Sequence, residues 1–133
     1  MEYFNIAIDG PAGAGKSTIA KLAAEKLGFV YVDTGAMYRS MALYFIRQGI
    51  SPEDEEAIAR ACSQVEVAIR YADGAQQVIL NGEDVSGLIR SEEVGRMASA
   101  TSVYGPVRQK LVQLQKQLAR EADVIICLLY TSD

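Results

Sequence analysis

Gly10-Pro11-Ala12-Gly13-Ala14-Gly15-Lys16-Ser17-Thr18 is the stretch that decides the fold. It matches the phosphate-binding pattern G-x-x-x-x-G-K-[ST] without a gap. Glycine tolerates positive φ, so the backbone can turn several N–H groups toward one polyphosphate at the start of a helix. We expect Lys16 to reach the β- and γ-phosphates and the Ser17 hydroxyl to ligate Mg²⁺. The alternative is a glycine-rich turn that contains a lysine, a pattern expected by chance in roughly one of several hundred sequences this short.

The flanking residues supply the strand and the helix that such a loop requires. Residues 3–8 form a β-rich apolar run that ends at Asp9. Residues 16–27 are predicted to form a helix, because apolar residues recur at helical spacing before Gly28 ends it. The apolar face predicted for this helix consists of Ile19, Leu22, Ala23 and Leu27.

A second strand is predicted at residues 29–32, a short run of β-forming residues typical of a buried parallel strand. The segment that follows it reads Asp33-Thr34-Gly35-Ala36-Met37-Tyr38-Arg39. It leads into a helix that we expect to reach about Gln48 and to end at Gly49. Ligands of such a βαβ unit bind beyond the carboxyl ends of its strands. The chain is therefore predicted to be an α/β protein in which residues 10–18 and 33–39 face one crevice.

The periodicity then changes to that of antiparallel strands. Apolar residues alternate over residues 65–69, and a second apolar run covers residues 76–80. Asp73-Gly74 and Asn81-Gly82 are turn signals beside these runs. We expect two or three short antiparallel strands inserted beside the main sheet.

Two helices flank this insertion. Residues 51–62 are predicted to be helical, with Ser51 as the N-cap and Pro52 at the first position. Another helix opens at Ser91, which is followed by two acidic residues.

The clearest amphipathic helix follows Gly105-Pro106. Its apolar stripe consists of Val107, Leu111, Leu114 and Leu118. Arg108 therefore lies off the centre of the stripe. Residues 123–129 are predicted to form a third parallel strand.

The composition argues against several classes of protein. The 133 residues include 17 acidic and 13 basic ones, and the net charge of −4 argues against nucleic acid as a main partner. The sequence has no histidine, which excludes histidine-based catalysis and metal ligation. Cys62 and Cys127 are too few for a disulfide framework or a zinc site, so we expect two ordinary thiols in a reducing cytosol.

Nothing near the N-terminus has the basic and apolar regions of a signal peptide, because the chain enters a strand directly. The longest apolar run, residues 124–130, is too short to span a bilayer. We therefore expect a cytoplasmic protein without a membrane partner.

Residues 33–39 combine a hydroxyl, a glycine, an aromatic ring and a guanidinium at the mouth of the second strand. This set suits a nucleoside monophosphate, because arginine can bind its phosphate bidentately. The alternative is an ordinary helix N-terminus with Thr34 as its cap and Tyr38 in the core.

Together with the phosphate-binding loop, this segment resembles the bacterial cytidylate kinase family, whose members carry G-P-x-G-A-G-K and D-[ST]-G-x-x-Y-R at these places. The segment Asn81-Gly82-Glu83-Asp84-Val85-Ser86-Gly87-Leu88-Ile89-Arg90 is similar to the family's G-E-D-V-[ST]-x-x-I-R signature. Ala98-Ser99 and Val107-Arg108 are similar to its acceptor-side serine and arginine. The resemblance covers residues 3 to about 126.

The resemblance implies a P-loop NTPase fold of the nucleoside monophosphate kinase type. This fold has a parallel sheet with helices on both faces and a small antiparallel β insertion. Residues 1–133 would form one incomplete kinase domain, with a monophosphate-binding insertion at about residues 50–105. The implied reaction is transfer of the ATP γ-phosphoryl group to CMP or dCMP with Mg²⁺.

Carried over position by position, the resemblance gives residues 10–18 to the ATP phosphates and Ser17 to the metal. The residues implied to contact the acceptor nucleotide are Thr34, Arg39, Ser99 and Arg108. Lys16, Arg39 and Arg108 would neutralise charge during the reaction. A serine on a helix is otherwise a solvated or capping residue, and Arg108 is otherwise a surface arginine.

The chain departs from the family after Ile126, where relatives carry an Asp-Gly-Arg-Asp-[IM]-Gly segment, two more strands and an arginine-rich lid. Here the tail reads Cys127-Leu128-Leu129-Tyr130-Thr131-Ser132-Asp133. We expect a truncated fragment with a few foreign residues at its end. Residues 3–8 would then be an open sheet edge, so self-association is expected where the intact family is expected to be monomeric.

Two other functions stay open. One is a different small P-loop metabolite kinase, such as a shikimate-type kinase, against which residues 81–90 argue. The other is a nucleotide-binding module that does not catalyse a reaction.

Overall fold

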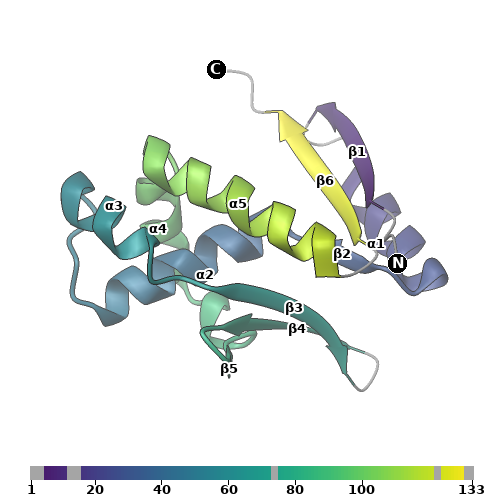
Figure 1. Ribbon diagram of the computed structural model, residues 1–133, viewed down its shortest axis with the longest axis horizontal. Coiled ribbons are helices and arrows are strands. Elements are labelled where there is room, and N and C mark those ends of the chain that lie inside the picture. The colour runs from purple at the N-terminus through teal and green to yellow at the C-terminus, as the bar shows by residue number, and fades with distance from the viewer. Residues whose placement is uncertain (1–4, 12–15, 73–74, 122–123, 131–133) are drawn as a thin grey trace. The chain divides into compact units, whose positions relative to one another are not determined.

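The computed structural model of the chain describes residues 5–11, 16–72, 75–121 and 124–130. The chain forms two compact units (Figure 1). The first consists of Met1–Thr34 and Gln115–Asp133, and the second of Gly35–Leu114.

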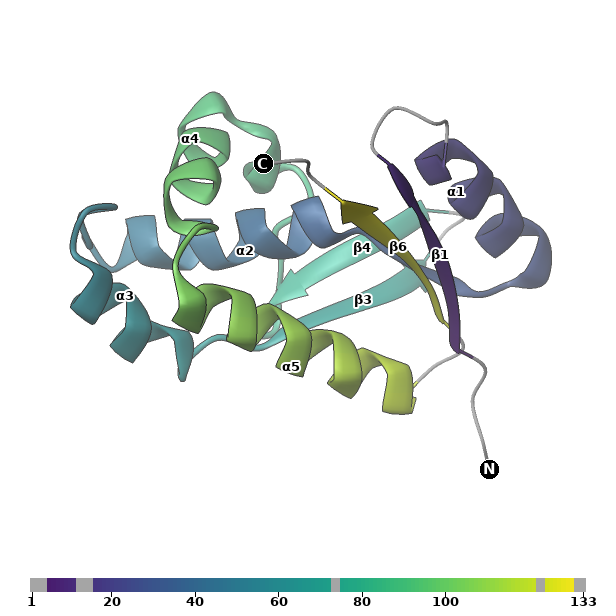
Figure 2. The ribbon, with the colours of Figure 1, turned by 90° about the horizontal axis from the view of Figure 1, so that it is seen from above.

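A parallel sheet forms the first unit. Its strands are β1 (Asn5–Pro11), β6 (Val124–Tyr130) and β2 (Val30–Val32), in that spatial order. Asn5 of β1 and Val30 of β2 both pair with Val124 of β6. Figure 2 shows β1 lying alongside β6. The three strands predicted from the sequence are confirmed, although β1 continues past Asp9 to Pro11.

Helix α1 (Lys16–Leu27) packs against the three strands of this sheet. Gly28 ends it as predicted, with φ of 71°, and the N–H of Phe29 donates to the carbonyl of Ala24 at 2.9 Å. This backbone conformation strains any residue with a Cβ, which explains the glycine.

The apolar face predicted for α1 is wrong at three of its four residues, and only Ala23 is partly buried and packs against the core of this unit. The helix buries Ala20 and Ala24 completely, and both pack with Tyr31 of β2. Ile19, Leu22 and Leu27 are instead 61%, 53% and 56% exposed. Short alanine side chains let the helix backbone approach the sheet closely, whereas the sequence pattern marks only the bulkiest residues.

The second unit contains α2 (Thr34–Arg47), α3 (Glu55–Cys62), α4 (Glu92–Thr101) and the first part of α5 (Gly105–Glu121). Its helices bury Met37, Met41, Phe45, Ile58, Val94, Met97, Val107, Leu111 and Leu114. The predicted stripe of α5 is confirmed, because Leu118 is buried too. The predicted end of α2 is also confirmed. Gly49 has φ of 69°, and the N–H of Ile50 donates to the carbonyl of Phe45 at 3.1 Å.

The N-cap predicted for the helix after Ser51 is wrong. The Asp54 carboxylate caps α3 by accepting from the N–H of Ala57 at 3.1 Å. Ser51 instead accepts from the N–H of Glu53 at 3.3 Å, which closes a turn before the helix. Both residue types compete for this role, and the ionised acceptor makes the stronger cap. The helix predicted to open at Ser91 is confirmed, and the Ser91 side chain caps it.

A small antiparallel sheet completes the second unit, as predicted. It consists of β3 (Val67–Ala72), β4 (Ala75–Leu80) and β5 (Glu83–Asp84). Asn81 and Gly82 turn the chain between β4 and β5 with φ of 48° and 86°. The Asn81 side chain also accepts from the N–H of Glu66 at 2.7 Å and so fixes the start of β3. The other predicted turn, Asp73-Gly74, lies outside the described residues.

The segment after this turn is held by its own side chains. Asp84 Oδ1 accepts from the hydroxyl of Ser86 at 2.6 Å and from its N–H at 3.0 Å, which lowers the pKa of Asp84. Ser86 Oγ accepts from the N–H of Val78 at 2.9 Å. A short 3₁₀ turn, η1 (Leu88–Arg90), then leads to α4.

A bidentate ion pair joins the small sheet to α2. Arg47 Nη1 and Nη2 donate to the Glu83 carboxylate at 2.8 and 3.1 Å. The hydrogen bond from Arg47 holds the pKa of Glu83 below its ordinary value. Arg47 lies at the end of α2, so Glu83 connects β5 to the helix that carries Arg39.

Within the described ranges, none of the helices combines the length and the apolar character needed to cross a bilayer.

We expect Glu83→Gln to lower the free energy of unfolding at neutral pH, because the variant loses the charge partner of Arg47. A lowered pKa in the folded state means that this contribution is present above about pH 4.5, the ordinary value, and is lost as the pH falls through the folded-state value. The difference between the two proteins, measured by chemical unfolding, should therefore shrink in acid. Glu66→Gln is the control and should change neither the free energy of unfolding at neutral pH nor its dependence on pH. A difference that stays constant into acid would contradict this assignment.

Candidate functional site

The parallel sheet brings two predicted site segments to one edge. β1 and β2 both run parallel to β6, so their carboxyl ends lie on the same side of the sheet. β1 ends at Pro11 and α1 begins at Lys16, while β2 is followed by Asp33 and by Thr34, the first residue of α2. Open α/β sheets bind their ligands at this edge.

The phosphate-binding loop lies mostly outside the described part of the chain. This holds for Ala12, Gly13, Ala14 and Gly15 and for the side chains of Lys16 and Ser17. Their contacts with ATP and Mg²⁺ stay predictions. A strand ends before these residues and a helix begins after them, which is the order that an anion-binding loop requires.

Ser17, the residue expected to ligate magnesium, lies at the start of α1, and its side chain is outside the described residues. Ser17 is the second residue of α1, and one protein hydroxyl with phosphate and water oxygens is a usual magnesium coordination. Among the described residues, no three histidine, cysteine, aspartate or glutamate side chains are grouped closely enough to hold a metal ion.

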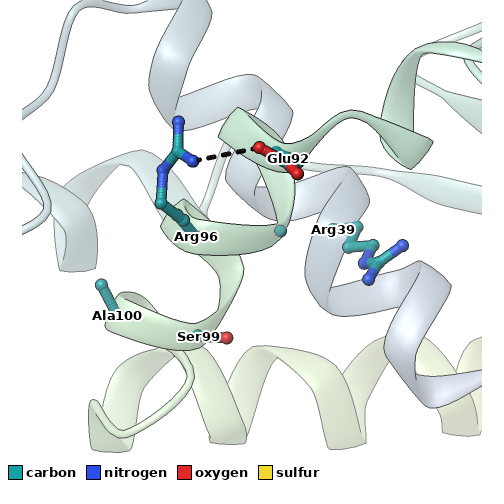
Figure 3. Close-up of a pocket in the computed structure, with 6 residues that line it drawn as sticks. Arg39, Glu92, Arg96, Ser99 and Ala100 are labelled. Atoms are coloured by element: carbon teal, nitrogen blue, oxygen red, sulfur yellow. Dashed lines mark ion pairs between the residues drawn. The ribbon is translucent and has the colours of Figure 1, made fainter.

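An open hollow of about 770 Å³ lies on the second unit, between α2 and α4 (Figure 3). Its lining consists of Arg39, Glu92, Gly95, Arg96, Ser99 and Ala100. We call it the α2–α4 pocket. Arg39 and Ser99, two of the four residues expected to contact the acceptor, thus line one pocket although they lie far apart in the sequence.

Helical spacing explains which residues of α4 line this pocket. Glu92, Arg96 and Ser99 recur at intervals of three or four residues, so they lie on one face of the helix. The opposite face carries Val94 and Met97, which are buried. The Ser91 side chain accepts from the N–H of Val94 and so fixes the residue at which the helix begins.

The Arg39 guanidinium lies close to the backbone of α4. A β-carbon at Gly95 would be 3.7 Å from Arg39 Nη2, an ordinary contact distance. A long side chain at position 95 would therefore compete with the guanidinium for space. Gly95 keeps this part of the pocket open.

The pocket carries two guanidinium groups and one carboxylate, which leaves one positive charge in excess. Arg96 Nη1 lies 3.6 Å from Glu92 Oε2, and the two side chains are 74% and 95% exposed. The Arg39 side chain forms no ion pair or hydrogen bond with any residue that the structure describes. The pocket is therefore suited to an anionic ligand.

Arg108 does not line the pocket. It lies in the first turn of α5, and its Nε donates to the carbonyl of Ser102 at 3.1 Å. The hydroxyl of Ser102 donates in turn to the carbonyl of Ser99 at 3.2 Å. Arg108 is thus attached to the end of the helix that carries Ser99. Thr34 belongs to the first unit, whereas Arg39 belongs to the second.

Sequence reasoning missed Glu92, Gly95, Arg96 and Ala100. A signal for three of them existed. A helix was predicted from Ser91, and counting back from Ser99 by three, four and seven residues reaches Arg96, Gly95 and Glu92.

Comparisons with known proteins agree with the resemblance. The family described as cytidylate kinase matches residues 6–127. A cytidylate kinase of Caldicellulosiruptor bescii is 48% identical over 126 residues, which cover 95% of this chain and 56% of that protein. Those of Geobacter sulfurreducens and Desulfitobacterium hafniense are 46% and 50% identical over 121 residues, covering 91% of this chain and 52% of each relative.

The chain thus spans about half the length of the curated relatives it matches. The extent expected from the motifs, residues 3 to about 126, agrees with the matched range. A match over nearly the whole chain, with relatives almost half identical to it, shows that the chain belongs to the cytidylate kinase family.

Proposed function

We propose that this chain supplies the donor loop and part of the acceptor site of a kinase that transfers the ATP γ-phosphoryl group to CMP or dCMP. Membership of the family supports the reaction type. The α2–α4 pocket carries the proposal, because it joins Arg39 and Ser99 beside an excess of positive charge. The finer fold assignment is a P-loop NTPase with a monophosphate-binding insertion at about residues 50–105.

On the donor side, residues 10–18 hold the phosphates of ATP with backbone N–H groups, and Lys16 contacts the β- and γ-phosphates. Mg²⁺, when bound through Ser17, supplies further charge neutralisation to the same phosphates. The strand, connection and helix order at residues 5–27 supports this proposal. The chain thereby fixes the transferring group in place.

On the acceptor side, Arg39 binds the phosphate of the monophosphate, and Ser99 donates to or accepts from the base or the sugar. Thr34 and Arg108 contribute further acceptor contacts, an assignment that rests on the family resemblance. Phosphoryl transfer needs its two phosphates in line and their charge neutralised, and little covalent help from the protein. A preference for cytosine over uracil and adenine also rests on the family.

The proposed reaction belongs to pyrimidine nucleotide metabolism, and we expect it in the cytoplasm, where ATP and nucleoside monophosphates are available. Equilibrium binding of ATP and CMP, measured beside turnover, tests it. Binding of both with turnover supports the kinase. Binding of ATP without CMP favours another metabolite kinase, and binding without turnover favours a nucleotide-binding module.

Lys16→Ala is expected to reduce the rate of phosphoryl transfer by roughly a hundredfold or more and to lower the affinity for ATP. The reason is that the variant lacks a cation beside the transferring phosphates. Isothermal calorimetry with ATP and a coupled kinase assay measure the two effects. Lys21→Ala is the matched control, since Lys21 lies on the same helix, 5.6 Å from the ring centre of Tyr31, and should keep ATP affinity. Unchanged ATP affinity and turnover in Lys16→Ala would contradict the proposal that residues 10–18 bind the phosphates of ATP.

Arg39→Ala is expected to lower the affinity for CMP by roughly tenfold or more and to leave the affinity for ATP unchanged. The loss arises because a charge-assisted hydrogen bond to the phosphate is removed. Arg108→Ala should act in the same direction. Arg60→Ala, which removes an exposed arginine of α3, is the control. A variant that weakens ATP and spares CMP would mean that the two sites are assigned the wrong way round.

We expect the 133-residue chain by itself to self-associate and to be a poor kinase. Support comes from the exposed Ile19, Leu22 and Leu27 of α1 and from β1, which pairs with β6 alone among the described strands. Leu22→Lys should reduce association in sedimentation velocity, whereas Val103→Lys, at a valine that is 65% exposed, should not. A monomer with cooperative unfolding and robust CMP-dependent ATP consumption would contradict this expectation.

A further inference from the structure

We propose that Arg96 is a second anion-binding residue of the α2–α4 pocket, and that Glu92 is an internal competitor which the ligand's phosphate displaces from it. The inference rests on the proposed function, in which this pocket binds a nucleoside monophosphate. It assigns a role to two residues that the family motifs do not include.

The positions of the two side chains suggest the competition. Glu92 and Arg96 both line the pocket, and their charged groups are 3.6 Å apart. In Figure 3 the ion pair joins Glu92 to Arg96, and Arg39 reaches the same pocket from α2. The carboxylate thus neutralises one of the two cations that line the pocket, whereas the other, Arg39, forms no ion pair with a described residue.

The Glu92–Arg96 pair is easily exchanged. Both side chains are largely exposed, and exposed pairs of this spacing on a helix contribute little net stability. A phosphate offers the guanidinium a bidentate, doubly charged partner, which makes a stronger charge-assisted hydrogen bond than the single contact to Glu92. Arg96 therefore loses little when it leaves Glu92 and gains more at the ligand.

The charge count points the same way. With Glu92 the pocket has one positive charge in excess, and without it two, whereas a phosphate monoester carries close to two negative charges near neutral pH. Removing the carboxylate while keeping its shape should therefore favour any ligand that bears a phosphate. It should leave an uncharged nucleoside unaffected.

The chain contains a matched control pair. Glu56 and Arg60 of α3 form the same kind of ion pair at the same spacing, with 3.3 Å between charged atoms, and are also exposed. Glu56 and Glu92 both lie in the first turn of their helices. Neither Glu56 nor Arg60 lines the pocket. Substitutions at this pair change net charge and helix-end charge alike without touching the proposed site.

The test measures dissociation constants of CMP, inorganic phosphate and cytidine by calorimetry for the 133-residue chain. Glu92→Gln should lower the dissociation constants of CMP and phosphate by roughly twofold to threefold. Arg96→Gln should raise both constants by roughly tenfold. Cytidine should bind each variant equally. Glu56→Gln and Arg60→Gln should stay close to the unaltered chain for all three ligands.

The double variant Glu92→Gln/Arg96→Gln decides whether Glu92 acts through Arg96. It should match Arg96→Gln, because the competitor has no effect once its cation is gone. The inference is overturned if the double variant keeps the gain of Glu92→Gln, or if the pocket variants follow their α3 controls. It is also overturned if phosphate does not bind at all.

The same measurements distinguish a failure of the proposed function from a failure of this inference. If phosphate follows the expected series while CMP fails to bind, or binds equally to Arg39→Ala, the anion site stands and the monophosphate assignment falls. If CMP binds and depends on Arg39 while the Glu92 and Arg96 variants follow their controls, the acceptor site stands and only the inference falls.

Discussion

The pairing of β6 with both β1 and β2 is the constraint on which the rest of the chain depends. Parallel strands cannot be joined by a tight turn, so each return to the sheet requires a crossover connection. α1 provides the crossover from β1 to β2. Everything from α2 to α5 lies between β2 and β6, so the second unit is an enlarged crossover with its own buried side chains and its own small sheet. The α2–α4 pocket is thus built within a connection.

The signature at residues 81–90 has a structural role within the second unit. Asp84 and Ser86 bond to each other and to β4, and Glu83 holds the end of α2 through Arg47. None of these residues lines the pocket. Their effect on the site passes through α2, which carries Arg39 in its first half and ends at Arg47. The motif that pointed to the family therefore supports the scaffold of the site.

Local rules predicted most elements, because their causes are local. Gly49 needs a left-handed backbone, and Leu111 belongs to a stripe whose period alone determines its burial. Besides the N-cap of α3, which is a local choice between Ser51 and Asp54, the errors occurred where the outcome depends on a neighbouring element. The sequence pattern predicted Ile19 to be buried, but α1 packs on the sheet through Ala20 and Ala24 and leaves Ile19 exposed. The role of Arg96 in the pocket required the position of α2, which no spacing within α4 reveals.

Gly95 limits how this pocket can vary among related sequences. Glycine inside a helix is less stable than alanine by roughly 0.5–1 kcal/mol, and one added carbon would still sit at ordinary contact distance from Arg39 Nη2. Drift toward alanine is therefore compatible with the site and favourable for the helix. A longer side chain that pointed toward α2 would displace the Arg39 guanidinium and so change the charge arrangement of the pocket.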